Sequence, residues 1–143
     1  MKYLVPLGRL FYAAIFAMSA PGHFESTTIA YAASKGVLFS SILVPASGVI
    51  ALVGALSIIL GYKARLGSLL LVIFLVPVTL AMHNFWDITD PMAHQIQRIM
   101  FMKNLSMLGT ALLIAYFGAG PLSLDNRTSD GSRPMQAYPQ KQD

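Results

Sequence analysis

The chain has 143 residues, of which 55% are hydrophobic and only 11% are charged, and its mean hydropathy is +0.61. Soluble domains carry roughly 25% charged residues, so this composition is typical of an integral membrane protein and argues against a soluble domain. The net charge of +4 and the pI of 9.6 do not indicate nucleic-acid binding, because the charges are few and scattered, and the absence of cysteine excludes a CxxC shuttle, thiolate metal sites and disulfides within this chain.

Residues 4–20 form the first expected membrane span, since a span needs about 20 mostly apolar residues. Arg9 lies near one end of this span, where we expect its side chain to extend to the interface or to bind a lipid phosphate or a helix C-terminus. Lys2 and the apolar run after it also resemble a signal peptide. Pro21 would directly follow the cleavage point and Arg9 interrupts the run, so a retained helix is the preferred interpretation.

The next segment, residues 21–41, is expected to be a loop with a short surface helix within Phe24–Ser34. His23 and Glu25 leave the first span here, and both are candidate ligand-binding residues. Spans are then expected at residues 42–61 and 66–83. Four residues, Tyr62-Lys63-Ala64-Arg65, separate these two spans, so the sequence predicts a tight antiparallel pair.

The third span ends in a polar and aromatic cluster, His83-Asn84-Phe85-Trp86-Asp87. His83 is a candidate catalytic residue because imidazole can accept and donate protons near neutral pH. Asn84 and Trp86 are candidate ligand-binding residues beside it. The alternative roles are hydrogen bonding at a helix end for His83 and Asn84, and anchoring at the membrane interface for Trp86.

Three histidines and a carboxylate could in principle bind zinc or iron. The histidines are His23, His83 and His94, and no pair has the i,i+4 spacing of a helical metal site. No HExxH motif occurs, and the histidines lie at helix ends. We therefore expect neither a metal nor a haem.

The fourth span is expected at residues 96–117 and contains Lys103 and Asn104. A charged group in hydrocarbon costs several kcal/mol, so an intramembrane lysine indicates a functional site. Lys103, Ser106 and Thr110 share one helix face, and we expect this polar stripe to face the interior of the bundle. Lys103 would there donate a hydrogen bond to an acidic or carbonyl ligand, such as a quinone oxygen. The alternative is a lysine that extends outward to the interface.

We expect an all-α, four-helix transmembrane domain at residues 1–125 and a flexible polar tail at 126–143. The charges predict how this domain is oriented in the membrane. Most of the ten basic residues fall on one side. They are Lys2, Arg9, Lys63, Arg65, Arg127, Arg133 and Lys141, against Lys35 and Arg98 on the other side. Both termini are therefore predicted to be cytoplasmic, and the candidate site residues other than Arg9 lie toward the outer leaflet.

Several of these motifs, taken in chain order, resemble the DoxX family over about residues 4–125. They are Gly8-Arg9-Leu10, Gly61-Tyr62-Lys63-Ala64-Arg65, His83-Asn84-Phe85-Trp86-Asp87, Lys103-Asn104-Leu105 and Gly118-Ala119-Gly120-Pro121-Leu122-Ser123-Leu124-Asp125. The resemblance implies a small four-helix protein of the bacterial inner membrane, with relatives linked to quinone-dependent oxidoreductases. It assigns Arg9, His83, Asn84, Trp86, Lys103 and Asn104 to a recurrent polar pattern. Ala51 and His23 depart from that pattern, because many relatives have a glutamate and a lysine there.

These observations lead to a first hypothesis, a redox-linked membrane protein that interacts with a quinone. Lys103 and Asn104 would bind a quinone oxygen, His83 would pass protons, and a redox partner protein would carry the electrons. If the chain is an enzyme, it would be a subunit of a quinone-linked oxidoreductase. The alternative is a non-enzymatic scaffold or a lipid- or partner-binding protein. A solute channel is disfavoured because the second span has few polar residues, and small residues on the helix faces permit self-association.

Overall fold

The computed structural model describes residues 3–129, which are helical and contain no β-strand. The elements in chain order are α1 (Leu4–Ser19), η1 (Ala20–Phe24), α2 (Ser26–Ser34), α3 (Ser40–Leu60), α4 (Ala64–Met82), η2 (Phe85–Asp87), α5 (Pro91–Phe117) and α6 (Leu124–Ser129). Four helical stretches, which contain α1, α3, α4 and α5, are long and apolar enough to cross a membrane. The expected all-α membrane fold is thereby confirmed. The predicted tail lies outside the described residues from position 130 onward.

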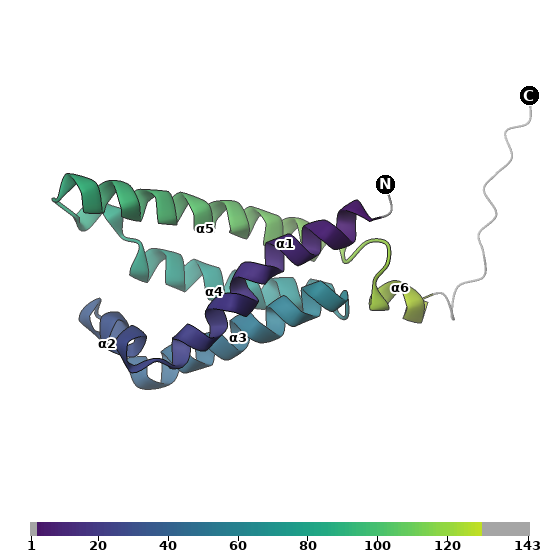
Figure 1. Cartoon of the computed structure of the whole chain (residues 1–143), viewed down its shortest axis with the longest axis horizontal. Coiled ribbons are helices and arrows are strands. Elements are labelled where there is room, and N and C mark those ends of the chain that lie inside the picture. The colour runs from purple at the N-terminus through teal and green to yellow at the C-terminus, as the bar shows by residue number, and fades with distance from the viewer. Residues whose placement is uncertain (1–2, 130–143) are drawn as a thin grey trace, which may run out of the picture.

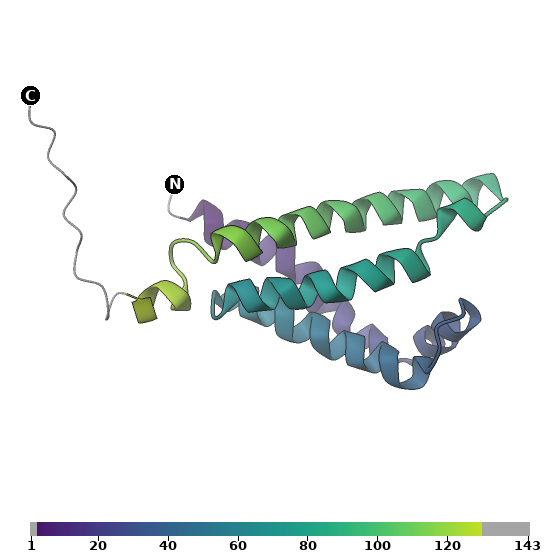
Figure 2. The same ribbon diagram turned by 180° about the vertical axis from the view of Figure 1, so that it is seen from behind.

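The helices are arranged so that the molecule has two distinct ends (Figures 1 and 2). The start of α1, the turn between α3 and α4, and α6 lie together at one end, which we call the inner end. The other end, the outer end, carries α2, η2 and the start of α5. Helix α3 packs between α1 and α4, and α4 packs between α3 and α5. The names follow the predicted orientation, in which the inner end is cytoplasmic.

Small residues bring α3 and α4 into contact over their inner halves. A Cβ atom added to Gly54 would lie 2.9 Å from the carbonyl oxygen of Gly67, so the two backbones nearly touch there. Without a hydrophobic driving force between helices in lipid, such close approach is a main source of packing energy. Larger side chains complete the core on either side, among them Phe16, Ile58 and Leu71.

Hydrogen bonds from Arg9 hold the segment after α5 against the inner end of the bundle. The Arg9 guanidinium donates hydrogen bonds to the carbonyl oxygens of Ala119 at 3.0 Å and Leu122 at 2.8 Å, and the residue is only 5% exposed. The Asp125 carboxylate, which interacts favourably with this charge, accepts hydrogen bonds from the backbone N–H groups of Lys63 and Ala64 at the start of α4. The expectation that Arg9 extends to the interface is wrong, because its hydrogen-bond partners are carbonyls brought back by the segment after α5.

Helix α5 begins at Pro91, five residues before the expected start of the fourth span. Asp90 accepts a hydrogen bond from the backbone N–H of Ala93 at 2.7 Å, and Pro91 occupies the first turn, where no backbone donor is needed. With 27 residues the helix is about 40 Å long, which exceeds the ~30 Å hydrocarbon core. Its first turns therefore extend past the other spans at the outer end.

Candidate functional site

The His83 cluster ties the outer end of α4 to α5. His83 Nδ1 and Gln97 Oε1 lie 2.7 Å apart and share a hydrogen bond, so Gln97 orients the imidazole. The Asn84 side-chain amide donates a hydrogen bond to the Asp87 carboxylate at 2.8 Å, and the side-chain oxygen Oδ1 of Asn84 is buried without a partner among the described residues. Both contacts fix the connection between the helices. The predicted catalytic role of His83 stays untested by this geometry.

Aromatic rings hold the same connection against the outer part of α5. The ring of Phe85 packs edge-on against those of Trp86, His94 and Phe101, with centroids 5.3, 5.5 and 5.4 Å away. Trp86 also contacts Phe101 and remains 54% exposed. A half-exposed indole at the end of a membrane helix is typical of an interface anchor.

Lys103 does not lie in the interior of the bundle. The expectation of an inward polar stripe is wrong, because Lys103 and Ser106 are exposed and the Lys103 ammonium lies 3.5 Å from the sulfur of Met100. The next residue, Asn104, is only 5% exposed and belongs to the packed face of α5. One turn of an α-helix is 3.6 residues, so adjacent residues point about 100° apart and these two side chains do not share one ligand here.

His23 and Glu25 lie on the connection between α1 and α2, whereas His83 directly follows α4 and its partner Gln97 lies on α5. His23 Nδ1 lies 3.2 Å from the carbonyl oxygen of Ser19, and its ring packs against Phe74 with centroids 5.6 Å apart. Glu25 is exposed and accepts a hydrogen bond from Thr27 at 3.5 Å. Residues 3–129 contain no group of three or more His, Asp or Glu side chains placed to hold a metal ion.

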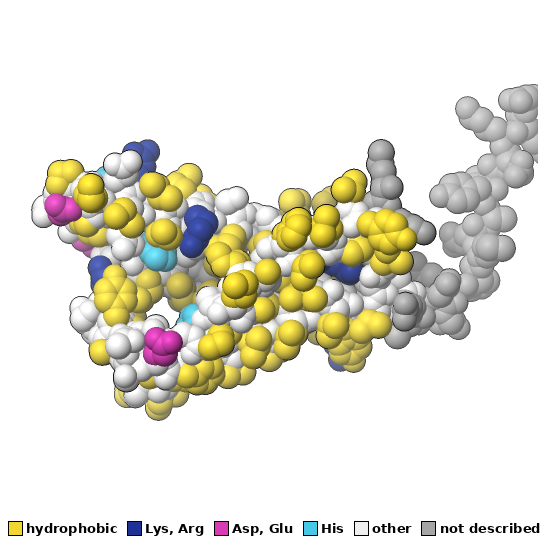
Figure 3. All heavy atoms as spheres, viewed as in Figure 1, with side chains coloured by type: hydrophobic (Ala, Val, Ile, Leu, Met, Phe, Trp, Pro, Cys, Tyr) yellow, Lys and Arg dark blue, Asp and Glu magenta, His cyan; other side chains and the backbone are white. Residues whose placement is uncertain are grey.

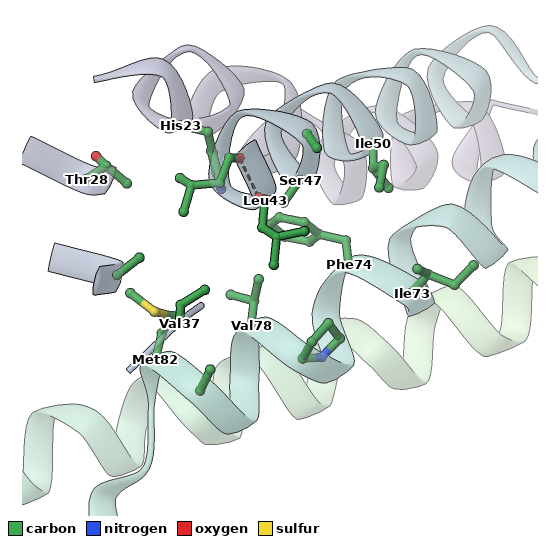
Figure 4. A pocket seen from close by; sticks show the side chains of 15 residues that line it. His23, Thr28, Val37, Leu43, Ser47, Ile50, Ile73, Phe74, Val78 and Met82 are labelled. Carbon is green, nitrogen blue, oxygen red and sulfur yellow. Dashed lines mark hydrogen bonds between the residues drawn. The ribbon is translucent and has the colours of Figure 1, made fainter. Parts of the chain in front are cut away.

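A cavity of about 380 Å³ lies between α2, α3 and α4 in the outer half of the molecule. Its wall is apolar, with Val37, Leu43, Ile50, Phe74, Val78 and Met82 among the lining side chains (Figure 4). The few polar lining residues are His23, Thr28 and Ser47, and Ser47 donates its hydroxyl hydrogen bond to the carbonyl oxygen of Val44 at 2.7 Å. The space-filling view also shows a hollow at the outer end of the molecule (Figure 3).

This cavity could not be predicted directly from the sequence, because its wall is built from the same residue types as a lipid-facing surface. One indirect signal of a gap between α3 and α4 is a pair of prolines, one in each helix. Pro45 and Pro77 occupy the outer halves of two adjacent helices, where each removes a backbone hydrogen bond. The helices touch near Gly54 and Gly67 and separate toward the outer end (Figure 2).

Comparison with known proteins places these features in a family. The family model of the SURF4 family matches residues 29–130, from α2 to just beyond α6. The inner membrane protein YphA of Escherichia coli (strain K12) is 31% identical over 100 residues, which cover 70% of this chain and 71% of YphA. The ER-derived vesicles protein ERV29 of Saccharomyces cerevisiae is 29% identical over 79 residues, which cover 55% of this chain but only 25% of ERV29. No solved structure matches the chain.

These matches overturn the DoxX resemblance and the function that was inferred from it. The matching family model and both relatives point to the SURF4 family. The hypothesis of a redox-linked protein that interacts with a quinone is therefore wrong, and so is the oxidoreductase assignment. The non-enzymatic alternative fits these matches better. YphA is named as an inner membrane protein and ERV29 as a protein of ER-derived vesicles, and the four long apolar helices agree with a multi-pass membrane protein.

Proposed function

The chain belongs to the SURF4 family, and we propose that it is a non-enzymatic membrane protein that holds a hydrophobic component of the membrane in the outer half of its bundle. The observation that carries this proposal is the apolar cavity of about 380 Å³ between α2, α3 and α4. Ligand sites in proteins are concave and mostly apolar, and this size is within their usual range of about 300–1,000 Å³.

The surrounding polar groups support binding rather than chemistry. The imidazole of His83 is hydrogen-bonded to Gln97, and that of His23 to the Ser19 carbonyl oxygen. Both imidazoles therefore stabilise the positions of the helix ends. Lys103 faces away from the packed interior. A reaction would require such groups to converge on one point, whereas the hydrogen bonds of His23, His83 and Lys103 go to three different partners and join none of them to another.

The relatives bear on where such a protein works. YphA is an inner membrane protein by name, and its similarity extends over 70% of this chain, which supports an inner-membrane location. The region shared with ERV29 is 25% of that protein, so the role of ERV29 in ER-derived vesicles is not carried over as a whole. What we transfer from the relatives as part of the proposal is a membrane-embedded helical unit.

Native mass spectrometry of the gently purified full chain tests the proposal. Val78 lines the cavity, whereas Val76, on the same helix, is exposed and does not line it. We expect a lipid or protein to co-purify with the wild-type chain and with Val76→Trp, and to be lost from Val78→Trp. Equal retention of every bound component by all three proteins would refute a function based on the cavity.

A further inference from the structure

We infer that the occupant of the cavity is one acyl chain of a bilayer phospholipid, which enters sideways from the leaflet at the outer end. This inference rests on the proposed function and names its ligand class. It is carried by the depth of the cavity, the chemistry of its wall, its size and the side on which it is open.

The depth of the cavity matches one leaflet. Its wall on α3 extends from Leu43 to Ile50, about 5–15 Å from the outer end of that helix at 1.5 Å per residue. Its wall on α4 extends from Ile73 to Met82, which covers the last ~14 Å of that helix. Half of a ~30 Å hydrocarbon core is about 15 Å, so both walls lie at the depth of the lipid tails.

The apolar chemistry of the wall argues against water as the occupant of the cavity. About a dozen molecules would fill the cavity at ~30 Å³ each, and each would need two to four polar partners. His23 and Ser47 already use backbone carbonyls as hydrogen-bond partners, and Thr28 is the one further polar residue on the wall. Apolar cavities of this kind stay dry. Left empty, the wall would forfeit dispersion contacts along its whole length.

The size of the cavity disfavours a protein segment. A helix is about 10–12 Å across, so roughly 5 Å of helix would already use this volume, which is less than one turn. An extended peptide is thinner, but its N–H and C=O groups would find no partners on this wall, and that is costly in hydrocarbon. A single hydrocarbon chain is thin and lacks such groups.

The opening of the cavity faces lipid. Leu43 and Ile73 line the cavity, yet they are 52% and 60% exposed, so the wall continues without a polar rim onto the outer surface of α3 and α4. Pro77 lies on the same border and is also exposed. A tail can therefore pass from the bilayer into the cavity without crossing polar groups. His23 and Thr28 come from η1 and α2, which lie at the outer end of the space (Figure 4).

Photo-crosslinking tests the inference with the full chain in phosphatidylethanolamine vesicles. The probe is a phosphatidylethanolamine that carries a diazirine in the middle of one tail, and the crosslinked peptides are mapped by mass spectrometry. We expect crosslinks in residues 43–50 and 73–82, at least fivefold weaker in Val78→Trp and unchanged in Val76→Trp. If Val78→Trp fails to fold, as judged by its elution profile, Ala81→Leu, a milder change on the same wall, replaces it.

The outcomes separate this inference from the function on which it rests. Equal crosslinking in both valine variants means that only surface lipid was labelled and overturns the inference. Labelling of the cavity by a diazirine fatty acid but not by the phospholipid also overturns it. If a co-purified protein is lost from Val78→Trp while lipid labelling of the walls does not change, the acyl chain is refuted and the binding function survives. If no component responds to Val78→Trp, both fail.

Discussion

Replacing Arg9 with methionine should release the segment after α5 from the inner end of the bundle. The substitution keeps a flexible, unbranched side chain and removes the hydrogen bonds to the carbonyls of Ala119 and Leu122. A hydrogen bond from a charged donor contributes about 1.5–3 kcal/mol, so the two together contribute about 3–6 kcal/mol. Because folded domains are stable by only about 5–15 kcal/mol, this loss is large enough to detach the segment or unfold the chain.

The assay is hydrogen–deuterium exchange of the purified protein, read on peptides that cover residues 118–126. We expect faster exchange there in Arg9→Met, together with a lower thermal midpoint in detergent. Arg9→Lys should show most of the effect, because one ammonium cannot reproduce the fork that reaches both carbonyls. Arg98→Met, at an exposed arginine of the outer end, is the control and should leave the segment unchanged. Unchanged exchange in Arg9→Met would show that the guanidinium does not hold this segment.

Two further predictions concern helix packing and orientation. Gly54→Ala should destabilise the protein by about 1–3 kcal/mol in thermal unfolding, because the added methyl group meets the Gly67 carbonyl oxygen at 2.9 Å. Gly109→Ala, with nothing within 4 Å, should change stability by no more than about 1 kcal/mol, and equal effects at both sites would contradict the packing argument. The chain has no cysteine, so single cysteines report orientation: in intact cells Ala33→Cys on α2 should react with an impermeant maleimide and Tyr62→Cys only after permeabilisation. The reverse pattern would place the termini outside.

The number and position of the long helices could be predicted from the sequence because the bilayer imposes the constraint. A spanning helix must satisfy its own backbone and present about 20 apolar residues, and charges between such stretches mark the limits. The position of the His83 cluster at the end of α4 follows from the same constraint. The start of α5 was placed five residues too late because Pro91 and Asp90 initiate a helix before its hydrophobic part begins.

The face on which Lys103 lies could not be predicted in the same way. In a soluble bundle the polar face of a helix is exposed to solvent. In a membrane we expected the polar face to be buried against the other helices. Helix α5 packs mainly on α4, and its deeply buried residues are Asn104 and Ala111, seven positions apart. Because lipid and the helix interior are equally apolar, hydrophobic residues cover every face of α5 and their period does not identify the packed one.

The hydrogen bonds of Arg9 at the inner end join two segments whose contact a single sequence does not reveal. Arg9 and Leu122 are 113 positions apart, and nothing in the composition of either segment indicates that they meet. What the sequence does contain is two glycines directly after α5. Gly118 and Gly120 adopt positive φ angles of 82° and 68°, which allow the chain to turn back toward α1. The buried arginine is explained by these turns and not by its own neighbours in sequence.

The inferred lipid tail would also supply packing at the outer end, where the helices contact one another little. The cavity opens onto the lipid-facing surface of α3 and α4, so in a bilayer its wall meets hydrocarbon instead of remaining empty. Helices α3 and α4 touch at Gly54 and Gly67 but separate beyond them, and α2 does not fill the gap. On the inferred acyl-chain site, a lipid tail would provide at the outer end the dispersion contacts that the neighbouring helix provides at Gly54 and Gly67.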